Sequence, residues 1–492
     1  MPVPPPQMFD RVPPLLSEGA GGLPEPYVYD ASPRALRSRV VAYGAKRFVD
    51  MMYVTGLDRA TALKHFRAKA VGVPGGLDSE PDNSSRQAEL VAAWRSGQIS
   101  LDTDDADRCV TVRWDDPEFG EPVVAAAIAR PGYGGILLGA RRAPSFEPRP
   151  LRRREPDFAR PWPLGDADPP MLDRREPAGA ELRRAADHFF ETSSGVYGVL
   201  VATPERILLE QYGDHGAPNR PTPSWSMTKA ITSTLIARML HEGWLGSVYD
   251  PAPAPLWRDP RAIHRLITID DLLRMRSGLG FPISDGGGRS SVVFENSFVY
   301  HNAEDAFATA QRAIVATRPG SVFRYINTGI NVLGAIIRDR IESRGLPYHE
   351  TVYGLLADRI GMTSYQHSAD CLGNLIASGS GAARLRDYAK LGILYLQDGS
   401  WDGERLLPKG WVDYALTPTH RGSAYTACFR ANADGMFPSL PPDTAWASGA
   451  SDQRVMILRR HELVITVTNE TDHPIDYAAL DRLGAAAVAL VS

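Results

Sequence analysis

The chain has 492 residues, enough for about two to four structural units of ordinary size. Hydrophobic residues make up 43% and charged residues 23%, which excludes a disordered chain and indicates a globular protein. The 54 basic and 58 acidic residues nearly cancel, so the chain lacks the strong field that would attract nucleic acid or an anionic membrane.

The N-terminal part predicts an extension that contains both helix and sheet. Residues 1–30 are rich in proline and lack the basic and apolar regions of a signal peptide. Apolar residues at helical spacing predict helix from Pro33 to Lys69, and we expect a shorter helix over Leu90–Trp94. Two apolar runs, Cys109–Trp114 and Val123–Arg130, predict strands.

A linker closes this extension, which we expect to span residues 1–175. Residues 141–170 are dense in arginine and proline, and they include consecutive arginines at positions 152–154. We expect these arginines to form a solvated face of the linker, with nucleic-acid binding as the alternative.

A second unit, residues 176–492, predicts an α+β fold. Its expected elements are helix 181–192, strands 196–202 and 206–212, a helix from near Ser226 to Gly243, a largely helical and irregular stretch over 245–440, strands 454–458 and 463–468, and a helix over 476–491. Because the strands come from opposite ends of the unit, the sheet must be assembled from distant segments. We therefore expect a largely antiparallel sheet with a helical insertion.

Ser226 and Lys229 lie three residues apart at the predicted start of a helix. Residues at this spacing share one helix face, with Cβ atoms about 5–6 Å apart. The first helical turn has free N–H groups and the positive end of the dipole, which suit an oxyanion beside a nucleophilic hydroxyl. The alternative is an N-capping serine followed by a surface lysine.

A second pair, Tyr325 and Asn327, could complete such a site. A tyrosine phenol can relay a proton between a serine and a leaving group, and an asparagine amide can orient a lysine or an acyl oxygen. The alternative is an ordinary capping or core pair.

These residues resemble the motifs of the serine β-lactamase-like hydrolases, together with a third motif, WASGASD, that begins at Trp446. That family includes class C β-lactamases, D-alanyl-D-alanine peptidases, family VIII carboxylesterases and 6-aminohexanoate-dimer hydrolases. Further segments that resemble the family are Ile267–Leu279, Pro319–Tyr325, Ile360–Thr363 and residues 379–412. The resemblance covers roughly residues 180–490 in the family's order.

The resemblance implies a β-lactamase/transpeptidase-like fold, with an antiparallel sheet flanked by helices and a helical insertion. It implies that Ser226 is the acylated nucleophile, that Lys229 is its base or proton partner and that Tyr325 is the general acid and base. Asn327 would be an orienting contact. The oxyanion hole would consist of the N–H groups of Ser226 and of Ala450, on the strand beside Gly449.

The third motif departs from the lactamase pattern of Lys-Thr-Gly. This chain has Ala447-Ser448-Gly449, so the cation that would bind a substrate carboxylate is missing. The departure favours neutral esters or amides over penicillins and peptide C-termini. Arg454 could substitute for the cation, but a surface position on a paired strand is the favoured interpretation.

We therefore expect a cofactor-free serine hydrolase that works through an acyl-enzyme on a small ester or amide. A carboxylesterase is favoured because alkoxide leaving groups need less assistance than amines, and an amidase or an acyltransferase is the alternative. A catalytically silent binding protein is the alternative of another class. Phe294, Phe298 and Tyr300 could line an acyl pocket on a flap, or could pack on the helical insertion.

The remaining patterns indicate a cytoplasmic protein without a metal. No His-Glu-x-x-His motif occurs, and no run of apolar residues is long enough to span a membrane. The three cysteines are distant from one another, as is usual in a reducing compartment. We expect the extension to cover the sheet or form the rim of the site, with formation of a homodimer as the alternative.

Overall fold

The structure, a computed structural model, describes residues 24–69, 92–139, 141, 143–165, 167, 177–259, 261–284, 292–294, 305–420, 422–469 and 475–492. Among the described helices, none combines the length and the apolar character that crossing a membrane requires.

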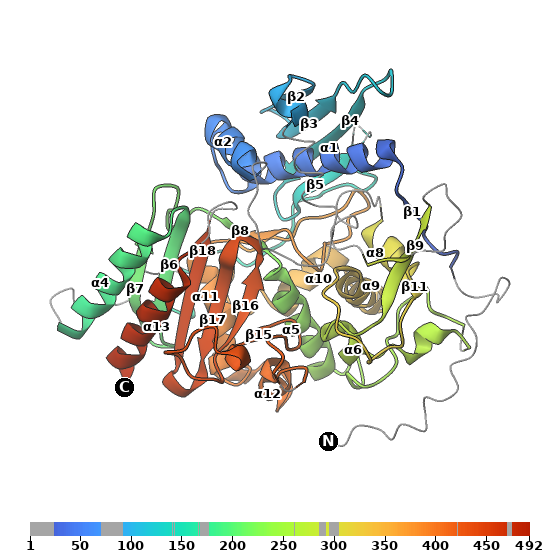
Figure 1. The fold of residues 1–492 in the computed structure, drawn as a ribbon. Coiled ribbons are helices and arrows are strands. Elements are labelled where there is room, and N and C mark those ends of the chain that lie inside the picture. The colour runs from blue at the N-terminus through green and yellow to red at the C-terminus, as the bar shows by residue number, and fades with distance from the viewer. Residues whose placement is uncertain are drawn as a thin grey trace.

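A six-stranded antiparallel sheet forms the centre of the C-terminal unit (Figure 1). Its strands, in spatial order, are β15 (Arg430–Ala431), β16 (Ala445–Gly449), β17 (Gln453–Leu458), β18 (Leu463–Asn469), β6 (Val196–Ala202) and β7 (Ile207–Tyr212). β18 pairs with β6, with Val464 opposite Ala202, which joins the two ends of the unit. The predicted sheet of distant, antiparallel segments is confirmed.

Helices cover both faces of this sheet, so its central strands are buried along their whole length. α4 (Pro177–Thr192) and α13 (Tyr477–Val491) lie side by side on one face (Figure 1). α11 (Leu385–Leu396), which belongs to the helical insertion, packs on the other face.

The insertion between β7 and β15 is largely helical, as predicted, and it also contains short strands that the sequence did not predict. Its elements are β8 (Thr222–Trp225), α5 (Thr228–His241), η3 (Ile263–Leu266), α6 (Ile269–Leu273), β9 (Leu279–Ser284), β10 (Val292–Val293), α8 (Ala306–Gln311), β11 (Ile314–Val315), α9 (Thr328–Glu342), α10 (Tyr348–Leu355), β12 (Gly381–Ala383), α11, β13 (Ser400–Trp401), β14 (Glu404–Arg405) and α12 (Trp411–Leu416). Short 3₁₀ turns, η4 (Asn432–Asp434), η5 (Ala450–Asp452) and η6 (Arg459–His461), connect the late strands.

The extension has its own hydrophobic core between two helices and a four-stranded meander. Its elements are α1 (Pro33–Val49), the π-helical turn η2 (Asp50–Val54), α2 (Arg59–Lys69), β2 (Ile99–Asp104), β3 (Cys109–Trp114), β4 (Val123–Arg130) and β5 (Gly134–Gly139). The predicted strands β3 and β4 are confirmed. The predicted helix over 33–69 is interrupted before α2, where Gly56 has a φ of 72°. Of the short helix predicted over 90–94, residues 92–94 are helical and the rest lies outside the described residues.

The extension and the linker are attached to the C-terminal unit by specific contacts. β1 (Tyr29–Asp30) pairs in parallel with β9 of the insertion. The Arg153 guanidinium forms an ion pair of 2.8 Å with Asp358, and it lies 3.7 Å from the centre of the Tyr353 ring. Arg154 donates to the backbone oxygens of Asp358 and Leu164. The predicted solvated face of linker arginines is therefore wrong for Arg153 and Arg154, because the linker docks these side chains on the insertion.

Candidate active site

Ser226 lies in a tight turn between β8 and α5. The preceding residue, Trp225, has a φ of 45°, a left-handed conformation that a tryptophan adopts only when its surroundings enforce it. The Met227 N–H donates to the Ser224 backbone oxygen across the turn, and the Ser224 hydroxyl lies 2.7 Å from that of Thr228. This network places Ser226 directly before the first turn of α5, as the sequence predicts.

Lys229 is buried on the first turn of α5, where it faces Ser226. Its Nζ lies 2.8 Å from the Ser226 Oγ and donates to the Ser378 backbone oxygen at 2.6 Å. Only 1% of the residue is exposed, so the alternative of a surface lysine is wrong. An amine buried this completely needs specific partners, and a serine hydroxyl is one of them.

The second motif lies beside this pair. The Lys229 Nζ is 5.0 Å from the centre of the Tyr325 ring, and the edge of Tyr325 meets the ring of Tyr425 at 5.8 Å. Asn327 is 5% exposed and directly precedes α9, where its backbone oxygen accepts from the Asn331 N–H. α9 packs against α5, so two neighbouring helices begin next to the first two motifs.

The third motif lies at the end of β16, close to the turn that holds Ser226. A Cβ on Gly449 would lie 2.3 Å from the Ser224 backbone oxygen, so only glycine allows β16 to approach β8 this closely. Ala447 is buried toward the insertion. Ala450 was expected on a strand, and that is wrong: it begins the turn η5, because Ser451 and Asp452 adopt left-handed conformations that turn the chain back into β17.

Arg454 points away from this site. Its residue is 4% exposed, and the guanidinium forms an ion pair of 3.0 Å with Asp452 among the rings of Trp446 and Tyr477. Trp446 belongs to the core on the α4 and α13 side of the sheet, opposite Ala447. The predicted surface position of Arg454 is therefore wrong, and the structure gives no support to its role as a substitute cation.

Sequence reasoning missed two features of the site. One is the segment before β12, whose Ser378 carbonyl binds Lys229. The other is Cys428, which is buried near Tyr425 and donates to the Leu273 backbone oxygen. Burial raises the pKa of the Cys428 thiol to about 12, so it stays protonated and is a poor nucleophile. The two features are distant in sequence from the motifs, and no local signal marks either contact.

The flap residues are described only in part. The centre of the Phe294 ring lies 3.8 Å from the guanidinium of Arg324, the residue directly before Tyr325. The same ring packs on Gly280 of β9. Phe294 therefore packs on the insertion and lies near the second motif. Phe298 and Tyr300 lie outside the described residues.

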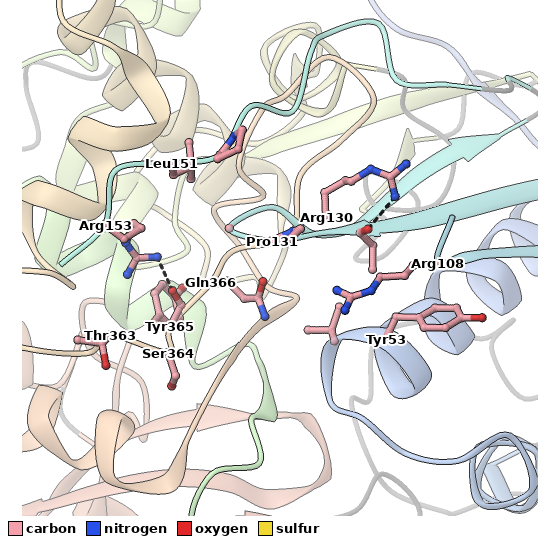
Figure 2. A pocket seen from close by; sticks show the side chains of 14 residues that line it. Tyr53, Arg108, Arg130, Pro131, Leu151, Arg153, Thr363, Ser364, Tyr365 and Gln366 are labelled. Atoms are coloured by element: carbon pink, nitrogen blue, oxygen red, sulfur yellow. Dashed lines mark hydrogen bonds between the residues drawn. The ribbon is translucent and has the colours of Figure 1, made fainter. Parts of the chain in front are cut away.

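A separate cavity of about 360 Å³ lies where the extension meets the insertion (Figure 2). Tyr53, Arg108 and Arg130 line it from the extension, and Tyr365 and Gln366 line it from the insertion. Figure 2 shows Arg153 at its edge, where the guanidinium donates to the Tyr365 backbone oxygen at 2.9 Å. None of the three motifs contributes to this lining. Among the described residues, no group of three or more His, Cys, Asp or Glu is placed to hold a metal ion.

Comparisons with known proteins bear on the fold and the family of this chain. No curated protein matches the chain in sequence. A protein assigned as a 6-aminohexanoate-dimer hydrolase from Bacillus anthracis superposes with a TM-score of 0.52 at 17% identity, over 68% of this chain and 88% of that one. A penicillin-binding protein homologue from Caulobacter crescentus superposes with a TM-score of 0.50 at 18% identity, over 64% of this chain and 98% of that one. At these identities the likeness establishes the fold.

The family assignment comes from the sequence itself. The profile of the Beta-lactamase family matches residues 182–490, which is more than half of the chain. The predicted family and fold are confirmed. The chain therefore belongs to the beta-lactamase family.

Proposed function

We propose that the protein hydrolyses a small ester or amide through an acyl-enzyme on Ser226, and that it is a carboxylesterase by preference. The observation that carries the proposal is the contact of 2.8 Å between the Lys229 Nζ and the Ser226 Oγ, made by a lysine that is 1% exposed. A serine beside a buried amine is the arrangement that an activated nucleophile needs.

Three residues have the proposed chemical roles. Lys229, together with the Tyr325 phenol, accepts the proton of Ser226 while the Oγ attacks the substrate carbonyl. Tyr325 then gives a proton to the leaving group as the carbonyl–leaving group bond breaks. A water molecule attacks the acyl-enzyme, its proton passes through the same pair, and the acid departs as Ser226 is restored.

The backbone supplies the proposed oxyanion hole. The N–H of Ser226 lies at the start of α5, where the helix dipole favours negative charge. The N–H of Ala450 is the second donor, carried by the end of β16 that Gly449 lets approach β8. Asn327, buried before α9, is the proposed orienting contact.

The proposed substrate has no carboxylate that the third motif recognises. Ala447 replaces the cation, and Arg454 is turned to the other face of the sheet and paired with Asp452. An ester is favoured because its alkoxide leaves with less protonation than an amine does. The structural neighbour that is assigned as a 6-aminohexanoate-dimer hydrolase supports an amide as the alternative. Acyl transfer differs only in the nucleophile that replaces water.

The test compares p-nitrophenyl butyrate hydrolysis by the wild type and by Ser226→Ala. The matched control is Ser343→Ala, which changes an exposed serine at the far end of α9. We expect turnover to vanish in Ser226→Ala and to be unchanged in the control. Equal turnover in the wild type and Ser226→Ala would refute the proposal. If no ester or amide of a panel is turned over and Ser226 resists acylation, a silent binding protein of this fold would be favoured instead.

We also propose the division into an extension, residues 1–175, and a hydrolase domain, residues 176–492. The separate core of the extension and the family match over residues 182–490 support it. We also propose a reducing, cytoplasmic location, because the three cysteines are distant from one another in the sequence. A homodimer formed through the extension is the alternative to its role at the rim of the site.

A further inference from the structure

Helix α1 of the extension lies against the segments that hold Ser226 and Lys229. Figure 1 shows α1 running across the end of the hydrolase domain, next to β8. Two consecutive residues of the last turn of α1, Lys46 and Arg47, make the contacts. Both are buried, at 6% and 7% exposed, although the sequence around them carries no catalytic motif.

Arg47 supports the turn before the nucleophile. Its guanidinium lies 4.6 Å from the centre of the Trp225 ring, and it forms no ion pair with any residue that the structure describes. A cation stacked on an indole is attractive, and the attraction increases when water is excluded. Trp225 is the residue with the left-handed φ of 45° directly before Ser226. A strained backbone persists only where its surroundings hold it, and Arg47 is a part of those surroundings.

Lys46 supports the segment that binds the catalytic lysine. Its Nζ donates to the Ser368 hydroxyl at 2.9 Å, and that hydroxyl donates to the Ser380 backbone oxygen at 2.5 Å. Ser380 is also left-handed, with a φ of 64°. Two residues earlier, the Ser378 backbone oxygen accepts from Lys229.

The two segments that Arg47 and Lys46 support are paired with each other. Gly381, which begins β12, lies opposite Trp225 of β8. The Gly381 N–H donates to the Thr228 hydroxyl on the first turn of α5. The extension therefore contacts β8 directly, and through Ser368 it supports Ser380, the residue directly before β12. The two strands form the small sheet from which Ser226 and Lys229 are presented.

We infer that Arg47 and Lys46 are positioning residues for the Ser226–Lys229 pair, so that the extension is part of the catalytic apparatus. This inference rests on the proposed function. Arg47 acts through Trp225, and Lys46 acts through Ser368. Loss of either support lets the β8–β12 pair relax, which lengthens the contact between Lys229 and Ser226. A displacement of about 1 Å in a catalytic group lowers the rate by about 100-fold.

The experiment measures acylation of the full-length protein by a fluorophosphonate probe, together with kcat and KM for p-nitrophenyl butyrate. The variants are Arg47→Ala and Arg47→Lys, with Arg37→Ala as the matched control. Arg37 lies on the same helix and stacks on Trp114, but its ion pairs, to Asp116 and Glu118, lie within the extension. The control thus perturbs α1 without touching the hydrolase domain.

We expect Arg47→Ala to slow acylation and lower kcat by about 10- to 100-fold with little change in KM, and Arg47→Lys to recover part of the loss. Arg37→Ala should lower the melting temperature at least as much and leave kcat within about twofold. In a Trp225→Leu background, Arg47→Ala should have no further effect on kcat, because the two residues act as a unit. Equal kcat in Arg47→Ala and Arg37→Ala would overturn the inference.

A second measurement separates this inference from the proposed function. Hydrogen–deuterium exchange over residues 222–229 needs no substrate. Faster exchange there in Arg47→Ala than in Arg37→Ala supports the positioning role even if the wild type is not acylated, which would refute the proposed function alone. Equal exchange in the two variants overturns the positioning role.

Discussion

Replacing Gly449 with alanine is a direct test of how closely the third motif approaches Ser226, the proposed nucleophile. The new Cβ would lie 2.3 Å from the Ser224 backbone oxygen and 3.0 Å from the Gln453 Cβ. Carbon and oxygen atoms that are in contact but not bonded are separated by about 3.3 Å or more, so β16 and β8 must move apart by about 1 Å. The Ser224 oxygen belongs to the backbone, and the Gln453 Cβ is the first atom of its side chain. Rotation of a side chain therefore cannot relieve the strain.

The displacement acts on the site more than on the fold. It would move the N–H of Ala450 away from Ser226, and a shift of about 1 Å costs about 100-fold in rate. We expect Gly449→Ala to lower kcat for p-nitrophenyl butyrate by about that factor and to destabilise the protein by about 1–3 kcal/mol. Stopped-flow acylation and thermal unfolding measure the two effects.

The matched control is Gly354→Ala. Gly354 is in helix α10, and a Cβ there would meet nothing within 4 Å. This substitution should leave kcat unchanged and raise stability by up to about 1 kcal/mol, because alanine is the better helix former. Wild-type kcat and an unchanged melting temperature in Gly449→Ala would refute the close approach of β16 to β8.

Three further predictions concern the proposed catalytic lysine, the linker and a buried histidine. Lys229→Met should abolish turnover, and it should cost about 1–3 kcal/mol in unfolding free energy because the buried Ser378 carbonyl loses its donor; wild-type turnover would exclude Lys229 from the mechanism. Arg153→Met should destabilise the protein by about 3–5 kcal/mol in urea unfolding, because Asp358, with a side chain 13% exposed, is left without its cation. A change below about 1 kcal/mol would contradict this reasoning and mean that water solvates the Asp358 carboxylate. Burial lowers the pKa of His367 to about 4, so the unfolded chain binds the proton more readily between about pH 6.5 and pH 4. Stability should be highest above pH 6.5 and fall by about 3 kcal/mol toward pH 4, and His367→Gln should flatten this slope; an identical slope in the variant would contradict the assignment.

The sequence predicts the elements whose pattern is local. β3, β4 and β6 are alternating or continuous apolar runs, and the helix after Ser226 has a long apolar stripe, so their positions follow from periodicity. β5, by contrast, is rich in glycine, which has a low propensity for strands. Its pairing with β4, rather than its own composition, makes it a strand.

The candidate site shows the same division between local and distant information. The spacing of Ser226 and Lys229 is a local property, and the structure has their side chains in contact. The surroundings of Arg454 are set by Trp446 and Tyr477, which come from different segments, so the charge that suggested a surface position is buried. The contact of Arg47 with Trp225 joins residues from two units, and no pattern within either segment predicts it.

The most direct test of the central claim is to identify the residue that is acylated. The wild-type protein is treated with a fluorophosphonate probe, digested and analysed by peptide mass spectrometry, with Lys229→Met treated in parallel. We expect a single adduct on Ser226 in the wild type and a much slower reaction in Lys229→Met. An adduct on another residue, or labelling that proceeds at the same rate without Lys229, would contradict the account.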